Sequence, residues 1–287
     1  MITITGSQTQ AHVYTDVLDQ SAHDQLQRMV DHEAFQGLQV RIMPDVHAGK
    51  GSVVGFTCSL GEKLIPNVIG VDIGCGVRLD SINAKPGTWT FEGLDKVIRK
   101  EVPSGQGVRQ KEYAGLRNSN SKIGELFGNL EQELLQVCRS TGQDHDRVLR
   151  SLGSLGGGNH YLEVGKNSLG SFSFSIHCGS RNFGLQVAEF HQRKAMKIRN
   201  TPKGELSQLA WLDGEDAQLY AHDMQVAQAY ASLNRKVILD AVAKAMRWDV
   251  SETVAIESVH NYIDFAECFV RKGAISAAFG RELVVAT

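Results

Sequence analysis

Asp72 and Cys75 are the side chains of this sequence whose types and spacing most clearly suggest chemistry. They lie three residues apart in a short apolar run, with Gly70 and Gly74 close by. A carboxylate and a thiol arranged in this way could bind a divalent metal ion. Two simpler interpretations stay open: Cys75 could be a small buried residue, and Asp72 could cap a turn. Burying a carboxylate in an apolar segment is nevertheless costly without a cation or hydrogen-bond donors.

Three histidines add further candidate ligands. His160 follows three glycines and an asparagine, His177 ends a stretch of alternating apolar residues, and His260 ends an apolar stretch. A lone histidine at a strand end is more often a hydrogen-bonded core residue than a ligand. Together with Asp72 and Cys75, however, the three histidines predict one metal centre. Ligand softness alone ranks zinc first for this set, with manganese, iron and cobalt behind it.

Segments beside these histidines also suggest a phosphate or nucleotide ligand. The glycines at 156–158 would let backbone N–H groups approach a phosphate, although a tight bend explains them equally well. Asn159 and Glu163 could hydrogen-bond a nucleotide or orient His160. Arg181 offers a planar fork matched to phosphate, and a surface salt bridge is the alternative for it.

Apolar periodicity predicts the elements that must position these groups. Helical spacing predicts helices at residues 18–35, 123–137 and 215–247. Alternating or continuous apolar runs predict strands at residues 53–58, 77–82, 172–176 and 254–256. We therefore predict an α+β fold in which mixed β-sheets surround a central metal site. No repeat or linker divides the chain, so we expect a single domain over residues 1–287.

Other ionisable residues are expected to lie outside the metal centre. Asp45 and His47, in a turn predicted at 44–51, could orient ligands or carry protons, although a simple turn is equally plausible. Histidines on polar or helical stretches are predicted at the surface: His12, His23, His32, His145, His191 and His222. Cysteines outside the motifs are predicted to fill the core: Cys58, Cys138 and Cys268.

The composition narrows the class of protein. With 42% hydrophobic and 22% charged residues, the chain has the composition of an ordinary globular protein. A formal charge of -2 and a pI of about 6.6 exclude a generic polyanion binder, so contact with RNA must use a local site. Five cysteines without regular spacing indicate a reducing compartment, and we expect the cytoplasm. We expect no contact with a membrane, because no apolar segment approaches the length of a bilayer span.

Five segments together resemble the RtcB-type RNA ligase family: residues 43–49, 70–76, 156–163, 177–181 and 260–262. The resemblance extends over essentially the whole chain. It implies an RtcB-like fold and a monomeric enzyme that depends on GTP and Mn²⁺. Such an enzyme joins an RNA 3′-phosphate or 2′,3′-cyclic phosphate to a 5′-hydroxyl, in tRNA splicing or RNA repair, through a guanylylated histidine.

The resemblance also implies roles for individual residues. Cys75 would bridge two Mn²⁺ ions, with Asp72 and His160 on one ion and His177 and His260 on the other. The guanylate site would be lined by Asn159, His160, Tyr161, Leu162, Glu163, His260 and Asn261. Arg181 would hold an RNA phosphate, and Asp72, Cys75 and Arg181 are the expected catalytic residues. Manganese replaces zinc as the expected metal, because a two-metal phosphoryl-transfer site suits labile cations.

The sequence departs from the family pattern after His260. The family continues with a Gly-Ser-Met segment and a Ser-His-Gly-Ala-Gly segment whose histidine attacks GTP, whereas no histidine follows His260 here. We therefore expect this polypeptide alone to lack the guanylylation segment, and we predict that it retains metal even if it does not catalyse ligation. Two alternatives stay open: a metal-dependent phosphoesterase acting on RNA ends, and a non-catalytic module that binds RNA or metal.

Overall fold

The computed structural model describes residues 1–83, 87–168, 170–250, 255–280 and 282–285. The chain divides into two compact units, each assembled from three separate segments. Unit 1 contains Met1–Gly74, Gly184–Ala227 and Val259–Ser276, and unit 2 contains Cys75–Phe183, Gln228–Ser258 and Ala277–Thr287. Helices and sheets occur in both units, so the predicted α+β class is confirmed. The single domain over residues 1–287 stays a prediction.

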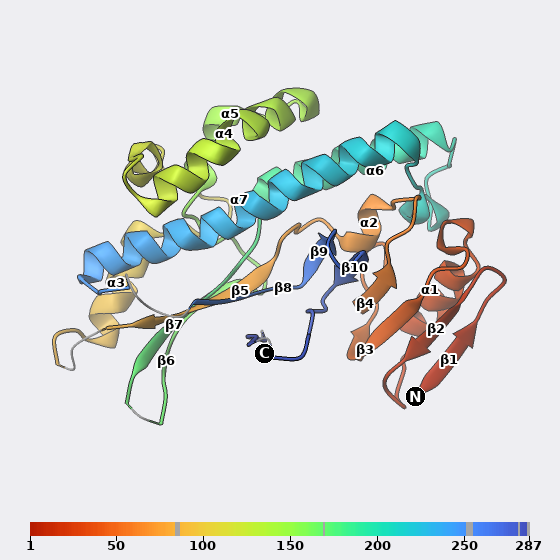
Figure 1. Cartoon of the computed structure of the whole chain (residues 1–287), viewed down its shortest axis with the longest axis horizontal. Helices are drawn as coiled ribbons and strands as arrows, with labels where there is room; N and C mark the ends of the chain where they lie inside the picture. The colour runs from red at the N-terminus through yellow and green to blue at the C-terminus, as the bar shows by residue number, and fades with distance from the viewer. Residues whose placement is uncertain (84–86, 169, 251–254, 281, 286–287) are drawn as a thin grey trace. The chain divides into compact units, whose positions relative to one another are not determined.

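Unit 1 is built on a six-stranded mixed sheet with the order β1-β2-β3-β4-β10-β9 (Figure 1). The strands are β1 (Ile2–Thr5), β2 (Gln10–Val13), β3 (Val40–His47), β4 (Val54–Ser59), β10 (Phe269–Lys272) and β9 (Asn261–Asp264). Strands β2 and β3 are parallel, and the other neighbouring pairs are antiparallel. Val40 and Ile42 on β3 pair with Cys58 and Phe56 on β4, and all four side chains are buried. This alternation of buried positions is typical of a sheet with one face in the core.

Short and long helices complete unit 1. They are α1 (Gln20–Val30), η1 (Glu33–Phe35), α2 (Pro66–Ile69), η3 (Leu206–Leu209), most of α6 (Arg181–Ile198) and the first part of α7 (Gly214–Met246). The carboxylate of Asp19 caps α1 by accepting the Ala22 N–H at 2.8 Å. Ala22, Leu26, Met29 and Val30 form the buried face of α1, at the spacing of an amphipathic helix.

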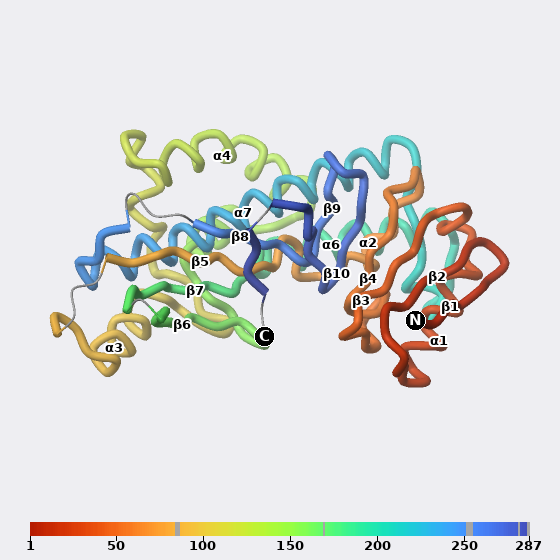
Figure 2. Tube along the Cα trace, turned by 60° about the horizontal axis from the view of Figure 1, so that its bottom comes forward, coloured from red at the N-terminus to blue at the C-terminus, as the bar shows by residue number. Residues whose placement is uncertain are grey.

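Unit 2 contains a four-stranded sheet with the order β6-β7-β5-β8. Its strands are β6 (Tyr161–Lys166), β7 (Phe172–Cys178), β5 (Gly76–Ile82) and β8 (Ala255–Val259). Strand β7 is antiparallel to both β5 and β6, and the three lie side by side in Figure 2. The central position of β7 therefore places its last residues between the chain segments that enter β5 and β6.

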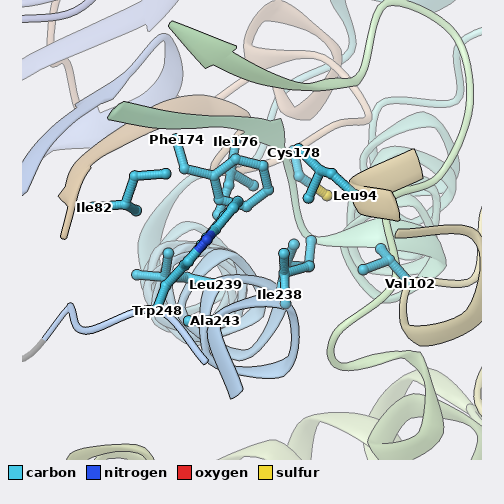
Figure 3. Close-up of a cluster of buried hydrophobic side chains, with 11 residues drawn as sticks. Ile82, Leu94, Val102, Phe174, Ile176, Cys178, Ile238, Leu239, Ala243 and Trp248 are labelled. Carbon is cyan, nitrogen blue, oxygen red and sulfur yellow. The ribbon is translucent and has the colours of Figure 1, made fainter. Parts of the chain in front are cut away.

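The core of unit 2 lies between its sheet and the second part of α7 (Figure 3). The helices of unit 2 are α3 (Phe91–Glu101), η2 (Ala114–Arg117), α4 (Lys122–Thr141), α5 (His145–Ser151) and the remainder of α7. Phe174 and Ile176 of β7 belong to the same buried cluster as Ile238 and Val242 of α7. The ring of Trp248 meets that of Phe174 edge to face, with centroids 5.9 Å apart. This packing fixes β7 against α7.

Most predicted elements are present, with local differences. Predicted helix 18–35 is divided between α1 and η1, and predicted helices 123–137 and 215–247 correspond to α4 and α7. Predicted strand 254–256 corresponds to β8, although Val254 lies outside the described residues. The turn expected from residue 44 begins later, because β3 continues to His47. Among the described residues, no helix combines the length and apolarity needed to cross a membrane.

Two placements predicted from the sequence are wrong. His191 is fully buried rather than at the surface, because the Asp223 carboxylate lies 2.8 Å from its Nε2 and satisfies that nitrogen within unit 1. Cys268 is exposed rather than in the core, because it lies in the turn between β9 and β10 with φ 57°. Neither residue belongs to the candidate site.

Candidate metal centre

A glycine-containing turn positions Cys75 at the start of β5. Gly70 and Gly74 have φ values of 90° and 71°, in the left-handed region that residues with a Cβ adopt at a cost. The turn connects α2 to β5 and carries Asp72 midway. Cys75 is 2% exposed, so its thiol lies in the protein interior.

Three predicted ligands lie at the same end of neighbouring strands in unit 2. Cys75 immediately precedes β5, His160 immediately precedes β6, and His177 is the second-last residue of β7. In the antiparallel register, His177 pairs with Val77 on one side and with Tyr161 on the other. Segments that are 85 and 102 residues apart from Cys75 in the sequence are thus brought to one place.

The thiol of Cys75 is close enough to each of the two imidazole nitrogens to share a metal ion with it. Cys75 Sγ lies 3.3 Å from Nε2 of His177 and 3.5 Å from Nε2 of His160. Sulfur and nitrogen ligands of one tetrahedral ion are about 3.6 Å apart, given metal–sulfur and metal–nitrogen distances of about 2.3 and 2.1 Å. The geometry and the chemistry of the donors therefore both fit a divalent metal.

A hydrogen bond fixes the tautomer of His160. Its Nδ1 lies 2.9 Å from the carbonyl oxygen of Leu155. A carbonyl oxygen can only accept, so Nδ1 carries the proton and Nε2 directs a lone pair towards Cys75. A histidine held in this way is oriented for metal binding before any metal arrives. His177 is 1% exposed and its ring packs edge to face against Tyr161, with centroids 5.2 Å apart.

Two further predicted ligands, Asp72 and His260, lie in unit 1 and are half-buried. Asn261 connects their segments: its Nδ2 donates to the Asp72 carbonyl at 3.3 Å, and its own carbonyl accepts the Gly74 N–H at 2.8 Å. The Oδ1 of Asn261 also accepts the Gly273 N–H at 2.9 Å. Asn261, which we predicted to line a guanylate site, therefore uses its amide to hold the turn that carries Asp72.

The predicted phosphate ligand Arg181 opens α6 with φ 59°. Its Nε donates to Ser154 Oγ at 3.1 Å, and its Nη2 donates to the carbonyl of Gly105 at 2.8 Å. The guanidinium lies where a side chain on Gly156 would stand, since a Cβ added there would be 1.7 Å from Nη1. The triple glycine of the sequence is thus partly explained by close approach of Arg181.

The remaining residues predicted to bind a nucleotide follow His160 along β6. Asn159 and Glu163 are exposed, whereas Leu162 packs against the apolar cluster of unit 2. The pKa of Tyr161 is raised by burial and, to a smaller extent, by the negative charge of Glu163. The exposed polar side chains could reach a ligand, and Leu162 could do so only through its backbone. Their role stays a prediction.

The sequence analysis missed two polar residues close to these ligands. Asn234 and Arg235 are both fully buried on α7. An Asn-Arg-Lys run in a long helix usually indicates a solvated face. A signal was present, however, because Asn234 is four residues from both Tyr230 and Ile238 and so shares their apolar stripe.

Comparison with known proteins shows the family to which the chain belongs. The family profile described as tRNA-splicing ligase RtcB matches residues 25–286. The chain belongs to the RtcB family. RNA-splicing ligase RtcB of Escherichia coli (strain K12) is 28% identical in an alignment that covers 84% of this chain and 65% of that protein. The tRNA-splicing ligase RtcB of Archaeoglobus fulgidus is 28% identical in an alignment that covers 90% of this chain and 66% of that protein. The chain therefore spans slightly less than two thirds of each of these curated relatives.

Proposed function

We propose that this chain carries the metal and RNA-end site of a GTP- and Mn²⁺-dependent RNA ligase. The ligase would join an RNA 3′-phosphate or 2′,3′-cyclic phosphate to a 5′-hydroxyl, in tRNA splicing or RNA repair. One observation carries the proposal: in a member of the RtcB family, the Cys75 thiol lies 3.3 and 3.5 Å from two imidazole nitrogens. The relatives are named as splicing ligases, which supports RNA as the substrate.

The proposed centre has five ligands and two ions. Cys75 would contribute to holding both ions, one together with Asp72 and His160 and the other together with His177 and His260. Chain connectivity supports the inclusion of Asp72, since residues three apart have Cα atoms within about 11 Å of each other.

A backbone hydrogen bond supports the inclusion of His260. The Gly74 N–H donates to the Asn261 carbonyl at 2.8 Å, which joins the residue before Cys75 to the residue after His260. Cys75 and His260 are therefore each covalently linked to one residue of this hydrogen-bonded pair.

The residues around the centre have distinct proposed tasks. When bound, Mn²⁺ would act as a Lewis acid on phosphate oxygens and neutralise their charge. Arg181 holds the RNA phosphate with the guanidinium donors that Ser154 and Gly105 leave available. The guanylate contacts come from Asn159 to Glu163, together with His260 and Asn261.

The same proposal includes a monomeric protein in the cytoplasm. Among the described residues no two cysteines form a disulfide bond, which supports a reducing compartment.

An RNA-binding experiment tests the proposed site. Two oligonucleotides of identical sequence, ending in a 3′-phosphate or a 3′-hydroxyl, are titrated with the protein in Mn²⁺ and again in EDTA. We expect tighter binding of the 3′-phosphate only with Mn²⁺, and we expect Cys75→Ala to remove that preference. Equal affinity for the two ends under all conditions would reject the site.

Adding reaction partners distinguishes the activities. A joined product formed from GTP and a 5′-hydroxyl RNA would show ligation. Hydrolysis of a 2′,3′-cyclic phosphate end to a 2′- or 3′-phosphomonoester on the RNA, without joining, would favour the phosphoesterase. Binding without any product would favour a non-catalytic module.

A further inference from the structure

Asn234 and Arg235, adjacent residues of α7, contact both segments that carry the histidine ligands of unit 2. One segment, residues 153–155, leads through the glycines to His160, and the other, residues 178–179, directly follows His177. Both side chains are fully buried, so their polar groups must be satisfied within the protein.

Asn234 forms hydrogen bonds to both segments at once. Its Oδ1 accepts the Gly153 N–H at 2.7 Å, and its Nδ2 lies 3.1 Å from the Ser154 carbonyl. The same Nδ2 lies 3.1 Å from Cys178 Sγ and 3.3 Å from the Gly179 carbonyl. One carboxamide therefore sets the separation between the two segments.

Arg235 and Cys178 strengthen the same connection. Nη1 of Arg235 donates to the Cys178 carbonyl, and its Nε and Nη2 bind Oε1 of Glu257 on β8 at 2.8 and 2.7 Å. Cys178 Sγ donates to the Leu155 carbonyl at 3.0 Å. That carbonyl also accepts from Nδ1 of His160. The orientation of His160 is thus linked to the strand end that carries His177.

We propose that Asn234 is a positioning residue for the metal centre, with Arg235 in support, and that it sets the distance and angle between the imidazoles of His160 and His177. This inference rests on the proposed metal site. Asn234 contacts neither imidazole and acts through the backbone segments beside them. A small error in ligand placement changes metal affinity and coordination geometry, as substitutions of residues behind metal ligands generally do.

The test compares two substitutions on α7. Asn234→Leu removes every hydrogen bond of the carboxamide and keeps a similar volume. Tyr230→Phe is the matched control: Tyr230 is fully buried one turn earlier, and its hydroxyl donates at 2.8 Å to the carbonyl of Val148, a residue of neither ligand segment. Both substitutions thus remove buried side-chain hydrogen bonding from the same helix. If Asn234→Leu does not fold, Asn234→Ser replaces it, because the shorter side chain cannot span both segments.

Binding of Co²⁺ and Mn²⁺ to each variant supplies the readout. The visible absorption of Co²⁺ depends on ligand geometry, and thiolate coordination adds a near-ultraviolet band. We expect Asn234→Leu to weaken metal binding roughly 10- to 100-fold and to alter the visible bands. We expect Tyr230→Phe to lower the unfolding midpoint without changing the affinity or the spectrum.

The outcomes separate this inference from the proposed function. If Asn234→Leu and Tyr230→Phe both keep the wild-type affinity and spectrum, the positioning role is rejected while the metal site stands. If the wild-type protein shows no thiolate band with Co²⁺, the metal site fails first, and with it the basis for this inference.

Discussion

Substitution of Gly156 by alanine should disturb the site in two separable ways. Gly156 has φ 95°, so any Cβ there strains the backbone by about 1–2 kcal/mol. The Cβ would also stand 1.7 Å from Nη1 and 2.6 Å from Cζ of Arg181, and 3.0 Å from Nδ1 of His160. The flexible guanidinium must therefore move and give up its bonds to Ser154 and Gly105.

Neighbouring glycines allow the two effects to be measured apart. Gly158 has φ 74° but no atom within 4 Å of an added Cβ, so Gly158→Ala should cost only the strain of about 1–2 kcal/mol. An added Cβ at Gly157 would meet only Gly105 Cα, at 3.9 Å, and Gly157→Ala should change stability by less than about 1 kcal/mol. Losing two hydrogen bonds of a half-exposed guanidinium adds roughly 1–2 kcal/mol, so Gly156→Ala should cost about 2–4 kcal/mol.

Urea denaturation of the three variants measures these free energies of unfolding. The expected order of loss is Gly156→Ala, then Gly158→Ala, then Gly157→Ala. Gly156→Ala should also weaken the preference for a 3′-phosphate RNA, because Arg181 is displaced. Equal destabilisation by Gly156→Ala and Gly158→Ala, with unchanged RNA binding, would refute the argument that this glycine makes room for Arg181.

Two further predictions concern stability. Burial lowers the pKa of Lys272 from 10.5 to about 8, with its Nζ donating to the carbonyls of Lys50 and Ser52. Between pH 8 and 10.5 the unfolded chain therefore binds more protons than the folded chain. The free energy of unfolding of the wild type should rise with pH across that window, by at most about 3 kcal/mol, relative to that of Lys272→Met. Parallel pH profiles of unfolding free energy for the two proteins would contradict this. Trp248→Ala should lower the free energy of unfolding by about 3–5 kcal/mol, measured by thermal or urea denaturation, because the ring fills the core beside Phe174. A loss below about 1 kcal/mol would show that the core closes around the gap.

Periodicity and local chemistry predicted much of the fold and part of the site. Alternation along residues 172–176 identified β7, and its end correctly located His177. The approach of Cys75 to His160 and His177 was inferred from their shared chemistry and from the family resemblance, since sequence spacing says nothing about which strands are neighbours. The antiparallel pairing of β7 with both β5 and β6 supplies that information.

Residues that act through buried hydrogen bonds were the hardest to predict. Asn234 and Arg235 look like part of a solvated helix face, although both are fully buried, and His191 looks exposed until Asp223 is found beside it. In each case the partner is distant in sequence. A prediction based on local polarity therefore places these residues at the surface. In the fold they are buried, because a polar group whose hydrogen bonds are satisfied can enter the core at little cost.

Metal analysis of Cys75→Ala tests the central claim most directly. The protein is loaded with Mn²⁺, desalted and measured by elemental analysis beside the wild type and Cys138→Ala, which removes a buried thiol from α4. We predict that the wild type and Cys138→Ala retain metal in equal amounts and that Cys75→Ala loses most of it. Equal metal content in all three proteins would contradict a centre built around the Cys75 thiolate.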